Sequence, residues 1–146
     1  MQTLNARILY IEDDPDSREL VSFVLSSYGY RVVATENPDH AVRLASSECF
    51  DLYLIDNWMP GCSGVQLCQK LRQFDSKTPI LFYSGAAFET DREVAFSSGA
   101  QGYLTKPVDN HELVHEVSHL ISRYPAHATI TDDSIAGAED QLAPFV

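Results

Sequence analysis

Short apolar runs alternate along the chain with longer segments in which apolar residues recur every three or four positions. The short runs are typical of strands buried on both faces of a sheet, and they predict strands at residues 7–11, 31–35, 50–55, 79–84 and 102–105. The longer segments have the spacing of amphipathic helices, and one follows each predicted strand. Strand and helix therefore alternate five times, which predicts an α/β fold with a parallel sheet covered on both faces.

Turn and capping residues indicate where the five predicted helices begin and end. The first opens at Pro15, where proline is tolerated, and ends before Gly29. The others are expected to begin after Asn37, after Gly64, at Glu89, and after Asp109 or Asn110. The fourth helix, residues 89–98, has the fewest apolar positions. The last carries a clear apolar stripe formed by Leu113, Val114, Val117, Leu120 and Ile121.

One domain accounts for most of the chain. A length of 146 residues, with 45% apolar and 21% charged residues, is typical of a globular domain with a core of ordinary size. Tyr124 and Pro125 end the alternating pattern, and the 22 residues from 125 onward hold four acids and no Lys or Arg. We expect a domain at residues 1–124 and a flexible acidic tail or linker at residues 125–146.

The overall charge argues against several classes of partner. A net charge of −11 opposes contact with the phosphates of nucleic acids and with anionic membranes. No apolar run reaches the length of a membrane span, and the first seven residues lack the apolar core of a signal peptide. The three cysteines have no paired metal-binding spacing, which favours reduced thiols. We therefore expect a cytoplasmic protein that contacts neither nucleic acid nor membrane directly.

Four of the five predicted strands end in a polar group. Glu12 and Asp13 follow the first strand, Asp56 the third, Ser84 ends the fourth and Lys106 follows the fifth. The carboxyl ends of parallel strands lie at one edge of a sheet, so these side chains converge if their strands are neighbours. Three converging carboxylates repel one another unless a cation neutralises them, and hard oxygen ligands of this kind suit Mg²⁺.

The same cluster has the groups that phosphoryl transfer onto a carboxylate requires. Lys106 supplies a compact positive charge and Ser84 a hydroxyl, and both suit phosphoryl oxygens. An acid left free to attack would complete such a site. For Asp56 taken alone, a second interpretation stays open, in which its carboxylate only accepts hydrogen bonds from the Pro60-Gly61 turn that follows it.

Four motifs contain the residues of this cluster: Ile11-Glu12-Asp13-Asp14, Asp56-x-x-Met59-Pro60-Gly61-x-x-Gly64, Ser84-Gly85, and Gly102-Tyr103-Leu104-Thr105-Lys106-Pro107. In order and in spacing, they resemble the motifs of the receiver domain of bacterial two-component response regulators. The resemblance covers about residues 7–124. It implies a flavodoxin-like, doubly wound sheet of five parallel strands in the order 2-1-3-4-5, with five helices.

The resemblance also implies a role for each residue of the cluster. Asp56 would be the phosphoacceptor and a ligand of Mg²⁺. Asp13 would hold the metal directly and Glu12 mainly through water, and the backbone carbonyl of Trp58 would be a further ligand. Asp14, the third acid of the first motif, is assigned to the start of the first helix.

The remaining roles concern the response to phosphorylation. Ser84 and Lys106 would contact the phosphoryl group, and Ser84 would draw its loop inward. Tyr103 matches the aromatic switch residue of such domains, which turns inward as that loop moves. The Lys106-Pro107 peptide bond would be cis.

The resemblance implies partners rather than a catalytic activity of the chain's own. A sensor histidine kinase or a histidine phosphotransfer protein would supply the phosphoryl group, and a downstream protein would respond, or phosphate would be relayed. A homodimer through the fourth and fifth helices is a further expectation. A Mg²⁺ phosphatase is disfavoured, because Trp58 stands where such enzymes usually carry a second carboxylate. Two alternatives remain: a receiver fragment of a larger hybrid kinase or transcription regulator, and a non-phosphorylated pseudo-receiver that only binds partners.

Two further features have open interpretations. Trp58, two residues beyond Asp56, would shield an acyl phosphate from water, or it is simply a partly exposed loop aromatic. His111, His115 and His119 share one face of the last helix. They would attract Zn²⁺ or Ni²⁺, lie in a dimer contact, or form part of a solvated face.

Overall fold

The structure is a computed structural model that describes residues 5–126. Most of the predicted acidic tail, residues 127–146, therefore lies outside the described residues. The strands are β1 (Arg7–Ile11), β2 (Arg31–Thr35), β3 (Leu52–Ile55), β4 (Ile80–Ser84) and β5 (Gly102–Thr105). The helices are α1 (Pro15–Ser27), α2 (Pro38–Ser47), α3 (Gly64–Arg72), α4 (Glu89–Ser97) and α5 (Asn110–Arg123).

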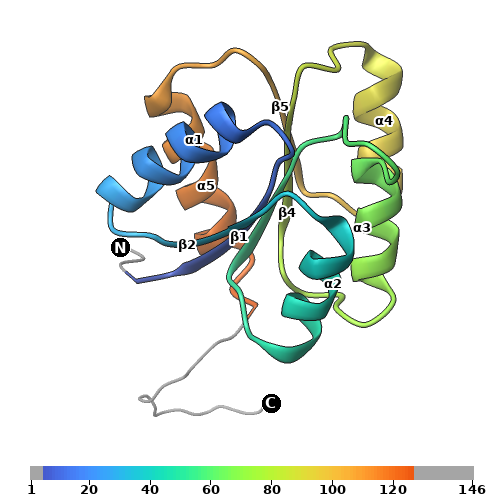
Figure 1. The fold of residues 1–146 in the computed structure, drawn as a ribbon, viewed down its shortest axis with the longest axis horizontal. Helices are drawn as coiled ribbons and strands as arrows, with labels where there is room; N and C mark the ends of the chain where they lie inside the picture. Colours follow the sequence, from blue (N-terminus) through green and yellow to red (C-terminus); the bar gives the residue numbers. More distant parts are fainter. Residues whose placement is uncertain (1–4, 127–146) are drawn as a thin grey trace.

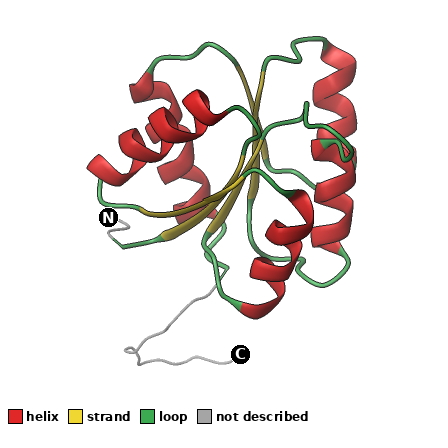
Figure 2. Ribbon diagram, viewed as in Figure 1, coloured by secondary structure: helices red, strands yellow, loops and turns green. Residues whose placement is uncertain are grey.

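All five strands are parallel and form one sheet in the order β2-β1-β3-β4-β5. Figure 1 shows α1 and α5 on one face of the sheet and α2, α3 and α4 on the other. The same three layers are visible with helices and strands coloured separately in Figure 2. The fold and strand order predicted from the sequence are thus confirmed.

The core has one apolar cluster on each face of the sheet. On β1, Leu9 and Ile11 belong to the cluster under α2, α3 and α4, whereas Ile8 and Tyr10 belong to the cluster under α1 and α5. This division follows from the alternation of side chains along a strand. All residues of β3 and β4 are buried, as expected of central strands in a parallel sheet.

Several helix starts are fixed by side-chain caps. The Asp14 carboxylate accepts the Ser17 N–H at 2.9 Å, which confirms its predicted place at the start of α1. Asp109, rather than Asn110, caps α5 by accepting the Glu112 N–H at 2.8 Å. In α4 only Ala95 is fully buried, in keeping with the few apolar positions of its sequence.

β3 begins two residues later than predicted. The Asp51 carboxylate accepts the Arg7 N–H at 2.8 Å, so a side chain rather than the strand ladder satisfies that donor. The strand ladder with β1 starts one residue further on, where Ile8 pairs with Leu52.

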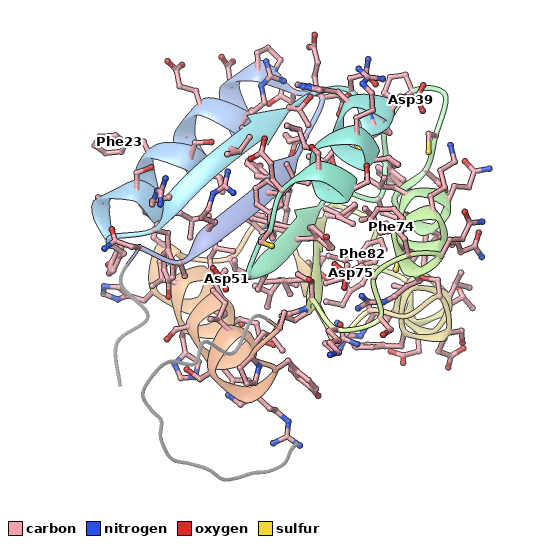
Figure 3. The ribbon with its side chains drawn as sticks, turned by 90° about the horizontal axis from the view of Figure 1, so that it is seen from below. Phe23, Asp39, Asp51, Phe74, Asp75 and Phe82 are labelled. Atoms are coloured by element: carbon pink, nitrogen blue, oxygen red, sulfur yellow. The ribbon has the colours of Figure 1, made fainter. Side chains whose placement is uncertain are left out.

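The edge of the sheet at the amino ends of the strands is held by a hydrogen-bonded network. Asp75, which follows α3, accepts the Tyr53 hydroxyl and the Thr78 hydroxyl, each at 2.6 Å. It also accepts two backbone N–H groups, those of Lys77 and Thr78, at 3.0 Å. Burial would raise the pKa of Asp75, but these hydrogen bonds outweigh it and lower the pKa to about 2. Figure 3 is seen from this side of the molecule and labels Asp75.

Arg72, the last residue of α3, ties this edge to the chain that enters β5. Its guanidinium donates to the backbone carbonyl of Gly99 at 2.9 and 3.0 Å and to the Gln101 side chain at 2.8 Å. A third nitrogen donates to the Asp75 carbonyl at 2.9 Å. The planar fork of an arginine suits such multiple acceptors, and here it joins segments 27 and more residues apart in the sequence.

Candidate functional site

Three carboxylates meet at the carboxyl edge of the sheet. Glu12 and Asp13 follow β1 and Asp56 follows β3, which is the neighbour of β1 with Ile11 paired to Ile55. Each acid can offer one oxygen such that all three oxygens lie within 4.8 Å of one another. Glu12 is 1% exposed and Asp56 7% exposed. Two like charges are therefore buried side by side, an arrangement that disfavours their simultaneous ionisation unless a cation is near.

Lys106 reaches this cluster from β5, and its bond to Pro107 is cis. Its ammonium nitrogen lies 2.7 Å from Glu12 Oε1 and 3.8 Å from Asp56 Oδ2, so its shorter contact is with Glu12. Burial would lower the pKa of Lys106, but the hydrogen bond to Glu12 and the charge of Asp56 raise it above its ordinary value. Lys106 is therefore a cation held among acids.

The pKa of Glu12 is raised by its burial, and the hydrogen bond from Lys106 opposes that rise. The nearby carboxylate of Asp56 raises it further. Because a divalent cation would neutralise this charge with hard oxygen ligands, the donor set fits Mg²⁺. Glu12, Asp13 and Asp56 are the residues of the described chain that are placed to hold it.

The backbone around Asp56 is tightly packed. The Trp58 N–H donates to Asp56 Oδ1 at 3.2 Å, so the turn contact considered for Asp56 is present beside the acid cluster. A Cβ at Gly64 would lie 2.7 Å from the Asp56 carbonyl oxygen and 2.8 Å from the Asn57 Cα. Only glycine allows α3 to begin this close to the end of β3.

Ser84 and Tyr103 are linked through one loop residue rather than to the acids. The Ser84 hydroxyl, which is fully buried, accepts the Ala86 N–H at 3.2 Å. The Tyr103 hydroxyl donates to the Ala86 carbonyl at 2.6 Å. Its ring stacks on Phe82 with centroids 5.7 Å apart and faces the Arg92 guanidinium at 5.5 Å. Tyr103 is thus turned inward, with 5% of its surface exposed.

The surface beside the acids is open. A groove of about 630 Å³ lies next to Asp13 and is lined by residues of the loops before α2 and α3, such as Glu36, and by Asp39 of α2 and Lys70 of α3. Trp58 is 64% exposed at this edge. The ligand role expected of its backbone carbonyl remains a prediction.

Two residues that contact the acids, Tyr10 and Arg18, were not predicted from the sequence. Tyr10, fully buried, donates its hydroxyl to Glu12 Oε1 at 3.2 Å. Arg18 donates to the backbone carbonyls of Glu12 and Asp13 at 2.8 and 3.4 Å. A signal for Tyr10 existed, because residues two apart on a strand share a face. For Arg18 no comparable pattern exists, since its contact depends on how α1 folds back on the loop.

Comparison of the chain with known protein families identifies the family to which it belongs. The model of the response regulator receiver domain matches residues 8–118 of the chain. The chain belongs to the response regulator receiver family. The match includes the acids, Ser84, Tyr103 and Lys106.

Curated relatives of this receiver are transcriptional regulators. The transcriptional activator protein PfeR of Pseudomonas aeruginosa is 36% identical over 117 residues, which are 80% of this chain and 38% of PfeR. The cell cycle transcriptional regulator CtrA of Caulobacter vibrioides is 33% identical over 123 residues, which are 84% of this chain and 53% of CtrA. The chain therefore spans about half or less of the length of these relatives.

Solved structures show the same receiver fold. The receiver domain of sensor histidine kinase PA1611 from Pseudomonas aeruginosa PAO1, with a magnesium ion coordinated in its active site cleft, is 29% identical. It has a TM-score of 0.75 and covers 81% of this chain and 98% of its own. The receiver domain of Francisella response regulator 1452 is 26% identical with a TM-score of 0.77, and covers 82% of this chain and 98% of its own. Among residues 5–126, none of the helices is long and apolar enough to span a membrane.

Proposed function

We propose that this receiver accepts a phosphoryl group on Asp56 from the phosphohistidine of a histidine kinase or a histidine phosphotransfer protein. The observation that carries the proposal is the meeting of Glu12, Asp13 and Asp56 within 4.8 Å, with Lys106 as the neighbouring cation. The magnesium-containing receiver of PA1611 supports Mg²⁺ as the cofactor, held by the same three acids in this chain.

In the proposed reaction an Asp56 carboxylate oxygen attacks the phosphorus in line with the phosphorus–nitrogen bond. That bond breaks, its electron pair stays on the imidazole nitrogen, and an aspartyl phosphate forms. Mg²⁺, when bound, supplies the positive charge that lets the carboxylate and the phosphoryl oxygens approach. Lys106 lies 3.8 Å from Asp56 and would pair with the phosphoryl oxygens as well.

In this proposal, the conformational change that follows phosphorylation is transmitted from Ser84 to Tyr103 through Ala86. Phosphorylation adds about 1.5 to 2 negative charges and strong acceptor oxygens at one point. Ser84 would donate its hydroxyl to them, which shifts the Ala86 loop that also holds Tyr103. If these contacts differ between two loop arrangements, phosphorylation changes their populations. The surface of α4, β5 and α5 would then present the signal to a downstream protein or to a second copy of the chain.

Intact-mass spectrometry after incubation with acetyl phosphate tests the proposal. We expect one added phosphoryl group on the wild-type protein in the presence of Mg²⁺, none without Mg²⁺, and none on Asp56→Asn. If the wild-type protein stays unmodified with acetyl phosphate and also with a phosphorylated kinase, the chain is a pseudo-receiver that acts by binding alone.

The relatives favour one extension of this function. PfeR and CtrA are both regulators of transcription of which this chain matches about half or less. We propose that the receiver controls a transcriptional output, either as part of a longer regulator or through a separate protein. It would act in the cytoplasm without direct contact to nucleic acid, and its own chemistry would be limited to gaining and losing the phosphoryl group.

A further inference from the structure

Tyr10 is a buried group that the proposed mechanism does not use. It lies on β1, is fully buried, and donates its hydroxyl to Glu12 Oε1 at 3.2 Å. The same oxygen accepts the Lys106 ammonium at 2.7 Å, while the other oxygen, Oε2, accepts the Asp14 N–H at 3.2 Å. Glu12 Oε1 therefore has two donors, one on a fixed strand and one on a flexible side chain.

The position of Tyr10 is rigid. Its ring belongs to the apolar cluster under α1 and α5, together with Ile8, Leu54 and Tyr83. Burial raises the pKa of the Tyr10 hydroxyl far above its ordinary value, so the group stays protonated and can donate. The ammonium of Lys106, by contrast, is carried at the end of a long aliphatic stem, and 25% of the Lys106 side-chain surface is exposed. Of the two donors, Lys106 is the one that can move.

The two distances of Lys106 show what its movement requires. Its ammonium lies 2.7 Å from Glu12 and 3.8 Å from Asp56, so pairing with a phosphoryl group on Asp56 weakens the contact with Glu12. Glu12 is 1% exposed, and water cannot readily replace the lost donor. A buried carboxylate that loses one of its donors is destabilised unless its remaining donors stay in place, and for Glu12 these are the Tyr10 hydroxyl and the Asp14 N–H.

We propose that Tyr10 is a positioning residue that keeps Glu12 hydrogen-bonded while the Lys106 side chain moves its ammonium group away from Glu12 and toward the phosphoryl group on Asp56. This inference rests on the function proposed above. The Tyr10 bond is the longer of the two in this structure, and it shortens as Lys106 departs. Tyr10 thereby lowers the barrier to phosphorylation without touching the phosphodonor.

Tyr10→Phe tests the inference by removing a single oxygen atom. Without the Tyr10 hydroxyl, the Glu12 carboxylate has one donor fewer when Lys106 moves away from it. We therefore expect the maximal rate of phosphoryl uptake from acetyl phosphate to fall about fivefold to tenfold. The concentration of acetyl phosphate that gives half the maximal rate should stay unchanged. Uptake is followed by intact mass at saturating Mg²⁺.

Mg²⁺ binding by the unphosphorylated protein supplies a second measurement. Trp58 is the single tryptophan of the chain, and its backbone N–H donates to Asp56 Oδ1, so its indole lies near the site and its fluorescence should report on Mg²⁺ binding. With Glu12 less firmly held in Tyr10→Phe, the dissociation constant of Mg²⁺ should rise about twofold to fivefold.

Tyr53→Phe is the matched control. Tyr53 is also buried on a central strand, and its hydroxyl also donates to a carboxylate, that of Asp75, at 2.6 Å. Both variants should lower the urea midpoint, but Tyr53→Phe should keep the rate of uptake and the Mg²⁺ affinity within twofold of the wild type. A folded Tyr10→Phe protein with wild-type rate and Mg²⁺ affinity would overturn the inference, and so would equal changes in both variants. Failure of the wild-type protein to gain phosphate would instead refute the proposed function.

Discussion

The two edges of the sheet differ in how their carboxylates are compensated, with a half-buried Asp75 at one edge and buried Glu12 and Asp56 at the other. At the amino edge, Asp75 accepts four hydrogen bonds from Tyr53, Thr78 and Lys77, and its pKa is lowered to about 2. At the carboxyl edge, Glu12 and Asp56 are buried within reach of each other, and the pKa of Glu12 is raised. The hydrogen bonds to Asp75 stabilise the fold. The negative charges of Glu12 and Asp56 are only partly neutralised, and a metal ion can neutralise the remainder.

This difference shows how one sheet combines a firm scaffold with a reactive site. Stability and function often compete for the same interactions, because a site that binds a charged group must leave its own charges incompletely compensated. In this receiver the two roles are separated by the length of the strands. Substitutions at the amino edge should therefore change stability, and those at the carboxyl edge should change reactivity.

Asp75→Ala should give the largest loss of stability. It leaves the Tyr53 and Thr78 hydroxyls and two backbone N–H groups without their acceptor. We expect the free energy of unfolding to fall by about 3 kcal/mol, measured by urea denaturation. The rate of phosphoryl uptake by the folded protein should stay unchanged, and a loss of uptake beyond the unfolded fraction would contradict the separation of the two edges.

Asp56→Asn should have the opposite effect on stability. It removes one of two buried like charges, so the free energy of unfolding in the presence of a chelator should rise by about 1 kcal/mol. Asp51→Asn, which weakens the acceptor of the Arg7 N–H at the amino edge, is the control and should give no such gain. A destabilised Asp56→Asn would mean that the carboxylate cluster stabilises the fold.

Acid should weaken the amino edge in a defined pH range. The pKa of Asp75 is lowered from 3.8 to about 2 in the folded protein, so its ionised form contributes stability above pH 4. That contribution is lost as the pH falls from about 4 to 2. Allowing for solvent screening, its size is about 1 kcal/mol. Comparing thermal midpoints at pH 5 and pH 2.5 should show a smaller drop for Asp75→Asn than for the wild type.

The smallest expected effect concerns an exposed aromatic at each edge. Trp58, 64% exposed beside Asp56, should shield the aspartyl phosphate from water, so phosphate loss from Trp58→Asn should be about twofold to fivefold faster. Phe74, 46% exposed after α3, lies at the amino edge, and Phe74→Asn should lose phosphate at the wild-type rate. Both rates are followed by intact mass after removal of acetyl phosphate. Identical lifetimes in the two variants would leave Trp58 as an ordinary loop residue.

The sequence predicted the carboxyl edge better than the amino edge, for a physical reason. Asp56 and Lys106 directly follow strands, and parallel strands bring their carboxyl ends together whatever the details of packing. The bonds from Arg72 to the Gly99 carbonyl join positions 27 residues apart, and no periodicity records such a pair. Tyr10 was not predicted, because a tyrosine in an apolar run resembles any other core residue and the sequence does not show that its hydroxyl bonds to Glu12.

Residues of α3 hold the segment that follows α4. The Gly99 carbonyl, just beyond the end of α4, accepts two Arg72 nitrogens, and Cys68 of α3 donates its thiol to the Ser98 carbonyl at 3.4 Å. The opposite end of α4 follows the loop that begins after Ser84 and contains Ala86. Near the start of α4, Arg92 donates to the Tyr103 carbonyl at 3.2 Å. We therefore expect a shift of that loop to move the start of α4 together with Tyr103, and to move the anchored end less.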